Sequence, residues 1–438
     1  MKTLVCKIST SFIEPCCAQP NSIDSKYFVF SSDVWAVFAL LKKHNVPAEY
    51  EELNHLHRHS DFSIFEDYSH IIYFTPFPRT IAQLHELEHI TTRAKQDGRN
   101  VIVVARAMGF GEALVAGKYI AADVVITEDD TSAAVAFLIE AGFFNNNRDH
   151  KQQIIKKGDL RPSDYTHEHA SFLDVLDEVE RFDYRSLPAM EKQRSLSAGI
   201  GCVHACTYCL KRCSSWRVVK PKQLAKEVAY WNSLPLYLFH NELFHKRSWV
   251  VEFIDAMQLY PKNTRLYSLG RIDSMYRCID LFPALSAIGL TSISIGLESV
   301  NQRILASMNK GQNELWKLDA LFEQAEKYGI QLNCNILLGM PEEDESSIQE
   351  TYNFVNTYHR TINISLLMPL PTTPVFEELK ELGFLSEANQ DAYKFISTFE
   401  KVKSSVPHIR TKHLSLEELQ DWHKRFMDVR NGYLSKPF

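Results

Sequence analysis

The sequence predicts an α/β protein with an N-terminal doubly wound sheet, a partial (β/α)6 barrel and a helical C-terminal region. Two observations support this prediction. Short apolar runs alternate with helical stretches before Gly142 and again after Leu196, and a polar segment containing Pro and Gly separates the two series. Strands that are spaced by helices in this way form parallel sheets with helices packed against their faces.

The first series covers residues 1–142 and predicts a five-stranded doubly wound domain. Its strands are expected at Thr3–Ile8, Glu49–Leu53, His70–Phe74, Val101–Ala105 and Val124–Thr127. Its helices are expected at Asp33–His44, Arg79–Gln96, Gly111–Tyr119 and Ser132–Ala141. Sheets of this kind bind ligands at the carboxyl ends of their strands, where the strand order reverses.

Residues 143–194 are polar and predict a linker with a short helix at Phe172–Val179. The barrel is expected at residues 195–376. Its strands are expected at Leu196–Ala198, Leu236–Phe239, Arg265–Ile272, Ser292–Gly296, Gln331–Leu338 and Asn363–Met368. The helices between them include Pro221–Trp231, Val250–Leu259, Glu314–Tyr328 and Ser346–Tyr358. Chemistry in such barrels takes place at the carboxyl ends of the strands. Residues 377–438 are expected to be helical, with Ser415 and Glu418 forming a capping box.

The composition is that of a soluble globular protein, with 45% hydrophobic and 23% charged residues among 438. No apolar run approaches the ~20 residues of a membrane-spanning helix. The amino terminus lacks the apolar core and cleavage site of a signal peptide, so we expect a cytoplasmic protein. The net charge of −6 argues against a generic nucleic-acid binder. Nine cysteines, an odd number, do not indicate a disulfide framework in a large unsecreted chain.

Three of the cysteines form the motif Cys202-x-x-x-Cys206-x-x-Cys209, which directly follows a predicted strand. Three thiolates from one loop can hold a [4Fe–4S] cluster and leave its fourth iron open. The amino and carboxylate groups of S-adenosylmethionine (SAM) can then bind that iron. The alternative is a structural zinc site, for which Cys213 or His204 would have to supply the fourth ligand. The strand before the loop and the βα units after it favour the cluster.

The order of the motifs resembles that of the radical SAM superfamily over residues 195–376. Besides the cysteine motif, the resemblance is carried by Leu236–Glu242, Gly270–Asp273, Ile295–Ser299 with Met308–Gly311, Leu338–Glu343 and Pro371–Pro374. It implies a [4Fe–4S] cluster that cleaves SAM reductively to a 5′-deoxyadenosyl radical. It also implies a set of SAM contacts: Tyr208 beside the cluster and adenine, Glu242 at the amino group, Arg271 at the carboxylate, Glu298 after the fourth strand, and Gly339 in the adenine-cradling motif.

Two positions depart from the pattern of the family. Glu342 stands where relatives usually carry glycine, and Ile200 replaces an arginine often found just before the cluster loop. Cys213 lies one helical turn past the motif, and a buried apolar role is favoured for it. Glu298 and Arg271 have an alternative interpretation as ordinary ion pairs at strand ends.

A doubly wound sheet ahead of a radical SAM barrel is similar to the cobalamin (B12)-binding-domain-containing radical SAM enzymes, whose N-terminal domain is flavodoxin-like or Rossmann-like. The resemblance implies that turns around Ser31, Thr75 and Arg106 hold cobalamin. The chain has no Asp-x-His-x-x-Gly motif, so an axial imidazole from that motif is not expected. The alternative is a degenerate domain that serves as a scaffold or substrate lid.

The leading hypothesis for function is cobalamin-dependent methyl transfer to an unactivated carbon or phosphorus centre. The first alternative is radical rearrangement, cyclisation or C–C bond formation without methyl transfer. A methylthiotransferase is disfavoured, because Cys6, Cys16 and Cys17 are crowded near the terminus and the tail is expected to be helical. The resemblance implies a flavodoxin-type or ferredoxin-type electron donor and a small-molecule or peptide substrate. The sequence does not indicate which substrate.

Overall fold

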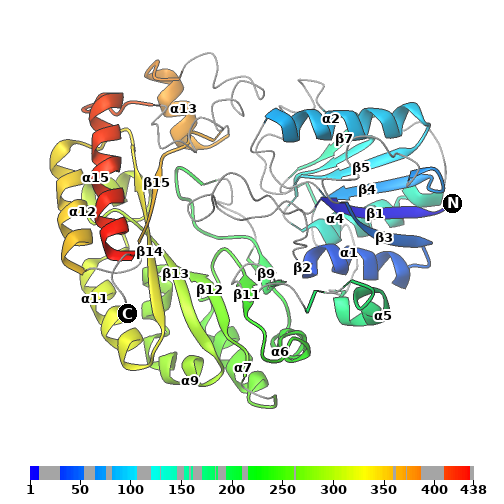
Figure 1. The fold of residues 1–438 in the computed structure, drawn as a ribbon, viewed down its shortest axis with the longest axis horizontal. Coiled ribbons are helices and arrows are strands. Elements are labelled where there is room, and N and C mark those ends of the chain that lie inside the picture. The colour runs from blue at the N-terminus through cyan, green and yellow to red at the C-terminus, as the bar shows by residue number, and fades with distance from the viewer. Residues whose placement is uncertain are drawn as a thin grey trace. The chain divides into compact units, whose positions relative to one another are not determined.

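The computed structural model is shown in Figure 1. It describes residues 1–8, 30–53, 65–74, 81–105, 120–128, 130–145, 152–156, 159–160, 170–182, 184–185, 194–209, 216–260, 263–358, 362–370, 372–385 and 409–434. The chain divides into two compact units. The first contains Met1–Ile200 and Lys226–Tyr237, and the second contains Gly201–Ala225 and Leu238–Phe438.

The first unit is built on a six-stranded parallel sheet in the order β3-β1-β4-β5-β6-β7. The strands are β1 (Thr3–Ile8), β3 (Ala48–Leu53), β4 (His70–Phe74), β5 (Asn100–Val104), β6 (Val124–Ile126) and β7 (Gln153–Ile155). The first five follow the flavodoxin-like order of doubly wound sheets. The order reverses between β1 and β4, and such folds bind ligands at the carboxyl ends of the strands at this point.

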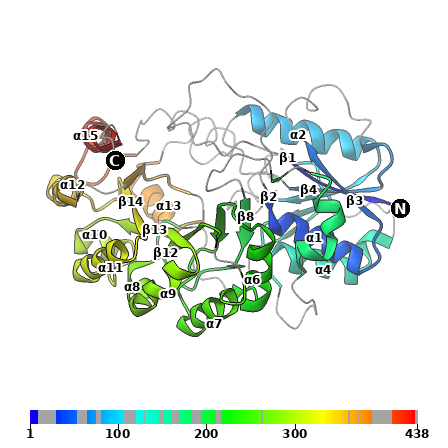
Figure 2. The same ribbon diagram turned by 60° about the horizontal axis from the view of Figure 1, so that its bottom comes forward.

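Helices cover both faces of this sheet. Figure 2 shows α2 (Ile81–Gln96) on one side and α1 (Ser32–Lys43) with α4 (Thr131–Glu140) on the other. Helix α1 is buried along almost its whole length, from Val34 to Leu41. Helix α4 begins at Asp130, whose side chain accepts a hydrogen bond from the Ala133 amide at 2.9 Å. Both helices therefore belong to the core of the first unit.

Residues 143–194, predicted as a linker, contain more structure than expected. Strand β7 extends the sheet by one strand, so the prediction of five strands was one short. The short helix was predicted correctly and consists of η4 (Phe172–Val175) and α5 (Leu176–Val179). A further short helix, η3, spans Phe143–Asn145. The helix expected at Gly111–Tyr119 lies outside the described residues.

The second sheet has seven strands in the order β15-β14-β13-β12-β11-β8-β2, and a separate pair joins β9 (Gly199–Ile200) to β10 (Arg217–Val218). The strands are β2 (Phe30–Ser31), β8 (Arg194–Ser197), β11 (Leu236–Phe239), β12 (Leu266–Gly270), β13 (Leu290–Glu298), β14 (Gln331–Leu338) and β15 (Ile362–Leu366). Six of them, β8 and β11 to β15, are the strands predicted for the partial barrel. Strand β2 was not predicted; it pairs in parallel with β8.

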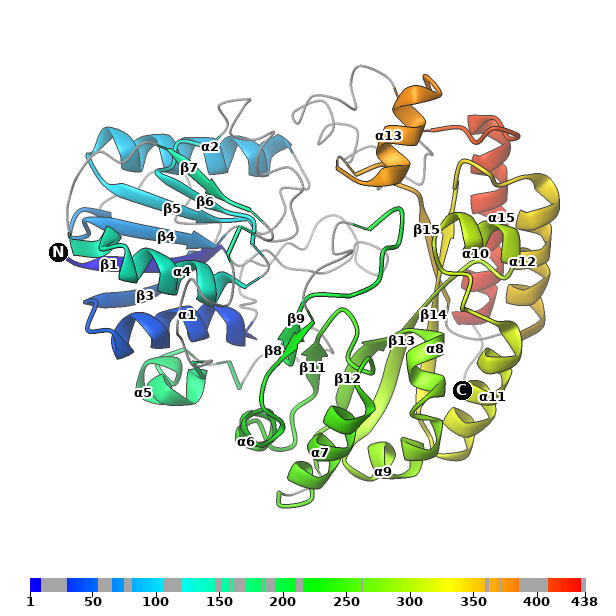
Figure 3. The same ribbon diagram turned by 180° about the vertical axis from the view of Figure 1, so that it is seen from behind.

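The helices of this part alternate with the strands. They are α6 (Pro221–Tyr230), α7 (Arg247–Met257), α8 (Ile272–Tyr276), η5 (Ile279–Leu281), α9 (Phe282–Ala287), α10 (Gln302–Ser307), α11 (Leu315–Lys327), α12 (Glu345–Tyr358), α13 (Pro374–Glu381) and α15 (Leu416–Leu434). Figures 1 and 3 show α11, α12 and α15 along the outer side of β14 and β15. The capping box predicted at the start of α15 is confirmed. The Ser415 amide donates to Glu418 at 2.8 Å, and the Glu418 amide donates to Ser415 Oγ at 3.2 Å.

The two faces of β13, β14 and β15 differ in character. Leu332, Cys334, Ile336 and Leu338 alternate along β14 and are buried. The opposite face carries polar side chains that bond across the strands. Asn333 Nδ2 donates to Ser292 Oγ, Asn335 Nδ2 donates to Ser294 Oγ, and Asn363 Nδ2 donates to Asn335 Oδ1, at 2.7, 2.9 and 3.1 Å. No helix in the described part of the chain is long and apolar enough to cross a membrane.

Candidate functional site

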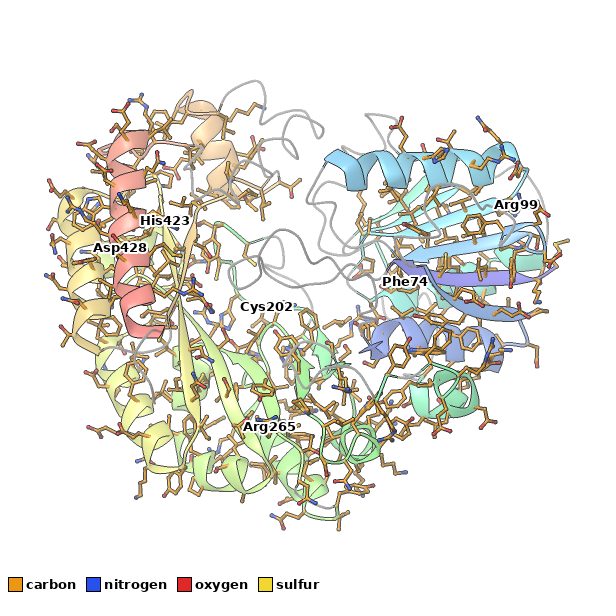
Figure 4. The ribbon with its side chains drawn as sticks, in the orientation of Figure 1. Phe74, Arg99, Cys202, Arg265, His423 and Asp428 are labelled. Carbon is orange, nitrogen blue, oxygen red and sulfur yellow. The ribbon has the colours of Figure 1, made fainter. Side chains whose placement is uncertain are left out.

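The cysteine motif lies in the loop that follows β9, at residues 201–209. Figure 4 labels Cys202 in this loop. Gly201 begins it with a φ of 84°, a left-handed conformation that glycine adopts without strain. Cys206 is buried, while Cys202 and Cys209 are half-buried. The three thiols therefore come from one short loop at the carboxyl end of a strand, as predicted.

Hydrogen bonds from two other elements fix this loop. The Thr207 amide donates to the Met308 carbonyl at the end of α10, and Asn309 Nδ2 donates to the Ala205 carbonyl, both at 3.1 Å. The Val375 amide at the start of α13 donates to the Thr207 carbonyl at 3.1 Å. The loop that carries the thiols is thus held on both sides by the barrel.

The donor set of the loop suits an iron–sulfur cluster. Within the described ranges, no group of three or more His, Cys, Asp or Glu side chains is gathered as a site for a metal ion. The cysteines of a [4Fe–4S] cluster bind different irons, so their sulfurs do not have to meet at one ion.

Burial, together with the charges of Glu242 and the other two thiols, raises the pKa of Cys202 to about 11. Binding of metal must therefore displace a proton from this thiol.

Glu242 lies beside the loop, three residues after β11. Its side chain is fully buried, and neither carboxylate oxygen has a hydrogen-bond partner among the described residues. Among the described residues, His204 Nε2 lies 3.6 Å and Arg271 Nε 3.9 Å from Oε2 of this carboxylate, and the guanidinium carries a positive charge. The Glu242 amide donates to His240 Nδ1, and Trp216 Nε1 donates to the Glu242 carbonyl, both at 2.9 Å. A fixed, buried carboxylate with unmet acceptors fits a ligand ammonium group.

Arg271 directly follows β12, and its guanidinium is also buried. Nε donates to Asp273 Oδ1 at 3.0 Å, and Nη1 donates to the sulfur of Cys206 at 3.4 Å. Burial opposes the charge of this group, but Asp273, Cys206 and Glu242 hold the pKa of Arg271 above its ordinary value. The sequence predicted a contact with the SAM carboxylate and did not foresee the contact with Cys206.

Glu298 ends β13 in a left-handed conformation, with a φ of 68°. Its Oε1 accepts hydrogen bonds from the Tyr208 hydroxyl and from Lys310 Nζ, both at 2.9 Å. Lys310 Nζ also donates to the Gly296 carbonyl at 2.8 Å. Burial and the charge of Glu298 raise the pKa of Tyr208. Both donors engage Oε1, which leaves Oε2 as the oxygen that can meet a ligand.

Lys310 was not among the predicted site residues, although its motif, Met308–Gly311, was part of the resemblance. The glycine at position 296 is a second feature of the sequence that could have indicated the pairing of Lys310 with Glu298. A Cβ atom there would lie 2.7 Å from both Glu298 Oε1 and Lys310 Nζ. The ion pair therefore depends on a glycine that precedes Glu298 by two residues.

Gly339 directly follows β14 with a φ of 100°, and a Cβ there would lie 3.1 Å from Leu419 Cδ2. The amides of Gly339 and Met340 donate to Oε2 of Glu343 at 2.5 and 3.2 Å. Glu343 is fully buried, and burial raises its pKa to about 7 although these amides oppose the shift. The turn after β14 is thus built around a buried carboxyl group. Glu342, which departs from the family pattern, forms an exterior ion pair with Lys412.

Of the three residues predicted to contact cobalamin, only Ser31 is among the described residues; Thr75 and Arg106 lie outside them. Ser31 is in β2, opposite Ser195 of β8, and precedes α1 without a side-chain capping bond. Phe74, labelled in Figure 4, is the last residue of β4, one of the two strands between which the sheet order reverses.

Comparison with known sequences identifies a family domain that covers the barrel strands β8 to β14. Residues 196–355 match the family model of the Radical SAM superfamily. A stretch of 94 residues is 39% identical to bacteriochlorophyllide d C-12(1)-methyltransferase of Chlorobaculum tepidum and represents 21% of each chain. A stretch of 215 residues is 24% identical to anaerobic magnesium-protoporphyrin IX monomethyl ester cyclase of Cereibacter sphaeroides, covering 47% of this chain and 34% of the relative. The matched part is thus well under half of each relative.

Two solved structures share the fold over most of the chain. The radical S-adenosylmethionine methyltransferase TsrM from Kitasatospora setae, with cobalamin and a [4Fe–4S] cluster bound, has a TM-score of 0.59 at 14% identity. The similarity covers 87% of this chain and 78% of TsrM. The cobalamin-dependent S-adenosylmethionine radical enzyme OxsB, with aqua-cobalamin bound, has a TM-score of 0.59 at 13% identity, covering 94% of this chain and 57% of OxsB. At these identities the similarity concerns the fold.

Proposed function

We propose, on the premise that this chain is a radical SAM protein over residues 196–355, that it is a cobalamin-dependent radical SAM methyltransferase. Its target would be an unactivated carbon or phosphorus centre. The observation that carries the proposal is the extent of the fold similarity to TsrM and OxsB. It covers 87% and 94% of the chain and so includes the doubly wound unit as well as the barrel.

We propose that Cys202, Cys206 and Cys209 bind a [4Fe–4S] cluster. When bound, the cluster supplies the electron that cleaves SAM into methionine and a 5′-deoxyadenosyl radical. The anchored loop keeps the three sulfurs at fixed positions, and the buried Glu242 accepts hydrogen bonds from the SAM amino group. Orienting SAM in this way lowers the entropic cost of reaction.

The remaining contacts follow from the geometry of the strand ends. The Oε2 atom of Glu298 is available to a hydroxyl of SAM, while Lys310 and Tyr208 hold the other oxygen. Gly339 allows the adenine to approach the backbone after β14. The guanidinium of Arg271 lies beside the cysteine loop and has five N–H donors. Nε binds Asp273 and Nη1 binds Cys206, and the remaining donors can bind the SAM carboxylate.

We propose residues 1–142 as the cobalamin-binding domain, followed by a connecting segment to residue 194, the barrel at 195–376 and the helical tail at 377–438. Cobalamin, when bound, carries the methyl group. The flavodoxin-like strand order supports this assignment, because ligands of such sheets bind where the order reverses. Phe74 ends β4 at this reversal, and the proposed contacts are the turns around Ser31, Thr75 and Arg106. We also propose a cytoplasmic location, a flavodoxin-type or ferredoxin-type electron donor, and a small-molecule or peptide substrate.

A second candidate function is cobalamin-free cyclisation or C–C bond formation. The 215-residue match to a relative named as a cyclase favours it. Here the doubly wound unit would serve as a scaffold.

One experiment separates the two candidates. The purified protein is incubated with hydroxocobalamin and desalted, and its absorption spectrum and cobalt content are recorded. The same preparation, with its cluster reconstituted anaerobically, is assayed for release of 5′-deoxyadenosine from SAM. About one cobalt per chain, together with SAM cleavage, supports the methyltransferase. Cobalt far below one equivalent with intact SAM cleavage refutes it in favour of the cobalamin-free function. Absence of SAM cleavage refutes both.

A further inference from the structure

The geometry points to Arg271 as the residue that sets the reduction potential of the cluster, through a hydrogen bond from its guanidinium to the sulfur of Cys206. This inference rests on the proposed function, because it requires Cys206 to be a cluster ligand. It adds a role to Arg271 beyond the contact with the SAM carboxylate.

The contact itself is direct and buried. Nη1 of Arg271 lies 3.4 Å from Cys206 Sγ, and the two residues are 6% and 8% exposed. Asp273 occupies the other edge of the guanidinium through Nε at 3.0 Å. The planar group cannot rotate without losing that bond, so Nη1 stays directed at the sulfur. The sulfur and its donor are thus shielded from water, which would otherwise compete for the hydrogen bond.

Both ends of the contact are held by rigid backbone. Gly270 precedes Arg271, and a Cβ there would lie 2.5 Å from Met275 Sδ and 3.1 Å from Phe244 Cδ2. These close neighbours fix the end of β12. The Arg271 carbonyl then accepts the Met275 amide at 2.9 Å in α8. On the other side, Thr207 anchors the cluster loop next to Cys206. The hydrogen bond is therefore built into the fold.

The physical effect follows from the charge that reduction adds. An electron on the cluster increases the negative charge on its ligand sulfurs. A hydrogen bond to a ligand sulfur and a nearby cation both stabilise the reduced state and raise its potential. Glu242 and Asp273 oppose this with negative charge, and neither can donate a hydrogen bond when ionised. Arg271 donates to the sulfur directly, and its charge persists at any working pH. Its removal would leave the acidic neighbours to disfavour reduction.

The test uses anaerobically reconstituted full-length protein without SAM. The reduced cluster is quantified by electron paramagnetic resonance in samples poised at a series of potentials, and iron content is measured in parallel. The variants are Arg271→Gln and Arg271→Lys. The control is Arg277→Gln, which removes a half-exposed cation 3.9 Å from Asp273. The hydrogen bonds of Arg277 go to Asp273, Ser274 and His245, so the control changes charge near the same acid while the bond to Cys206 remains.

We expect Arg271→Gln to make one-electron reduction at least tenfold less favourable, a fall of about 59 mV in the midpoint. Arg271→Lys should shift it in the same direction by less, because the shorter ammonium keeps the charge. Arg277→Gln should stay within twofold of the wild type. If Arg271→Gln fails to retain iron, Arg271→Lys decides. Wild-type potential in an iron-replete variant at position 271, or an equal fall in Arg277→Gln, overturns the inference. A wild-type protein that holds no four-iron cluster instead refutes the proposed function.

Discussion

Replacement of Lys310 by methionine should destabilise the barrel, because it removes the cation that neutralises Glu298. The Lys310 side chain is 4% exposed and donates to both the Glu298 carboxylate and the Gly296 carbonyl. Loss of one partner of a buried ion pair costs ~3–5 kcal/mol. In the variant, Glu298 still accepts the hydrogen bond from Tyr208, and its side chain is 12% exposed to water. We therefore expect a loss of stability at the lower end of this range, about 3 kcal/mol. For a domain of this size that corresponds to a fall in Tm of about 6–12 °C.

The assay is thermal unfolding of the cofactor-free protein, followed by circular dichroism, so that loss of a cluster does not contribute. Lys317→Met is the matched control. Lys317 pairs with Glu314 at 2.5 Å, but the glutamate is 45% exposed, so the expected loss is under ~1 kcal/mol. The double variant with Lys310→Met and Glu298→Gln should be more stable than Lys310→Met alone, because it leaves no uncompensated charge. Equal Tm values for the two single lysine variants, or a double variant less stable than Lys310→Met, would refute the reasoning.

Further predictions concern the cluster, SAM and a buried carboxyl group. Cys202→Ala, Cys206→Ala and Cys209→Ala should each lower the iron content of reconstituted protein well below four per chain; full iron in any of them removes that cysteine from the ligand set. Glu242→Gln should weaken SAM binding by ~1.5–3 kcal/mol, or ten- to a hundredfold, with the cluster intact. Calorimetry that finds unchanged affinity excludes this residue from the site. Glu343 has a pKa of about 7 when folded and 4.5 as its ordinary value. Folded protein therefore keeps the proton on Glu343 to a higher pH than unfolded protein does, so the contribution of this group to stability is fully present below pH 4.5 and falls by ~3 kcal/mol as pH rises through 7. Glu343→Gln should remove this fall. Denaturant unfolding of the wild type and the variant at pH 4.5 and 7.5 measures the difference, and an identical pH dependence in the two proteins contradicts the prediction.

The fold could be predicted largely because hydrophobic periodicity marks each strand and helix. His70–Phe74 and Gln331–Leu338 have the same bounds in the prediction and in the structure. β7 escaped prediction because Gln153–Ile155 has only three residues, and its neighbours are polar. A run of three residues is too short to show the hydrophobic alternation that distinguishes a strand from a loop. These residues form a strand because they pair with β6. The same holds for β2, which has two residues.

The sequence predicted where the residues of the candidate site lie in the fold better than it predicted which side chains they contact. Residues that follow parallel strands meet at one edge of a sheet, so the sequence alone is enough to group Glu242, Arg271, Glu298 and Gly339. The partners of each depend on side-chain geometry between distant segments. Arg271 and Cys206 are 65 positions apart, and nothing in either motif indicates that the guanidinium reaches the sulfur.

The polar side-chain pairs between β13 and β14 and between β14 and β15 help to determine how these strands align. The pairs Asn333–Ser292, Asn335–Ser294 and Asn363–Asn335 join neighbouring strands through side chains, in addition to the backbone ladder. A shift of one residue would turn amides toward the side where Leu332, Cys334 and Ile336 are buried, and would place these apolar groups among hydroxyls. Both faces of the sheet therefore oppose a shift. The heights at which β13 and β14 end, and with them the spacing of Glu298 and Gly339, are set in part by polar pairs in the middle of the strands.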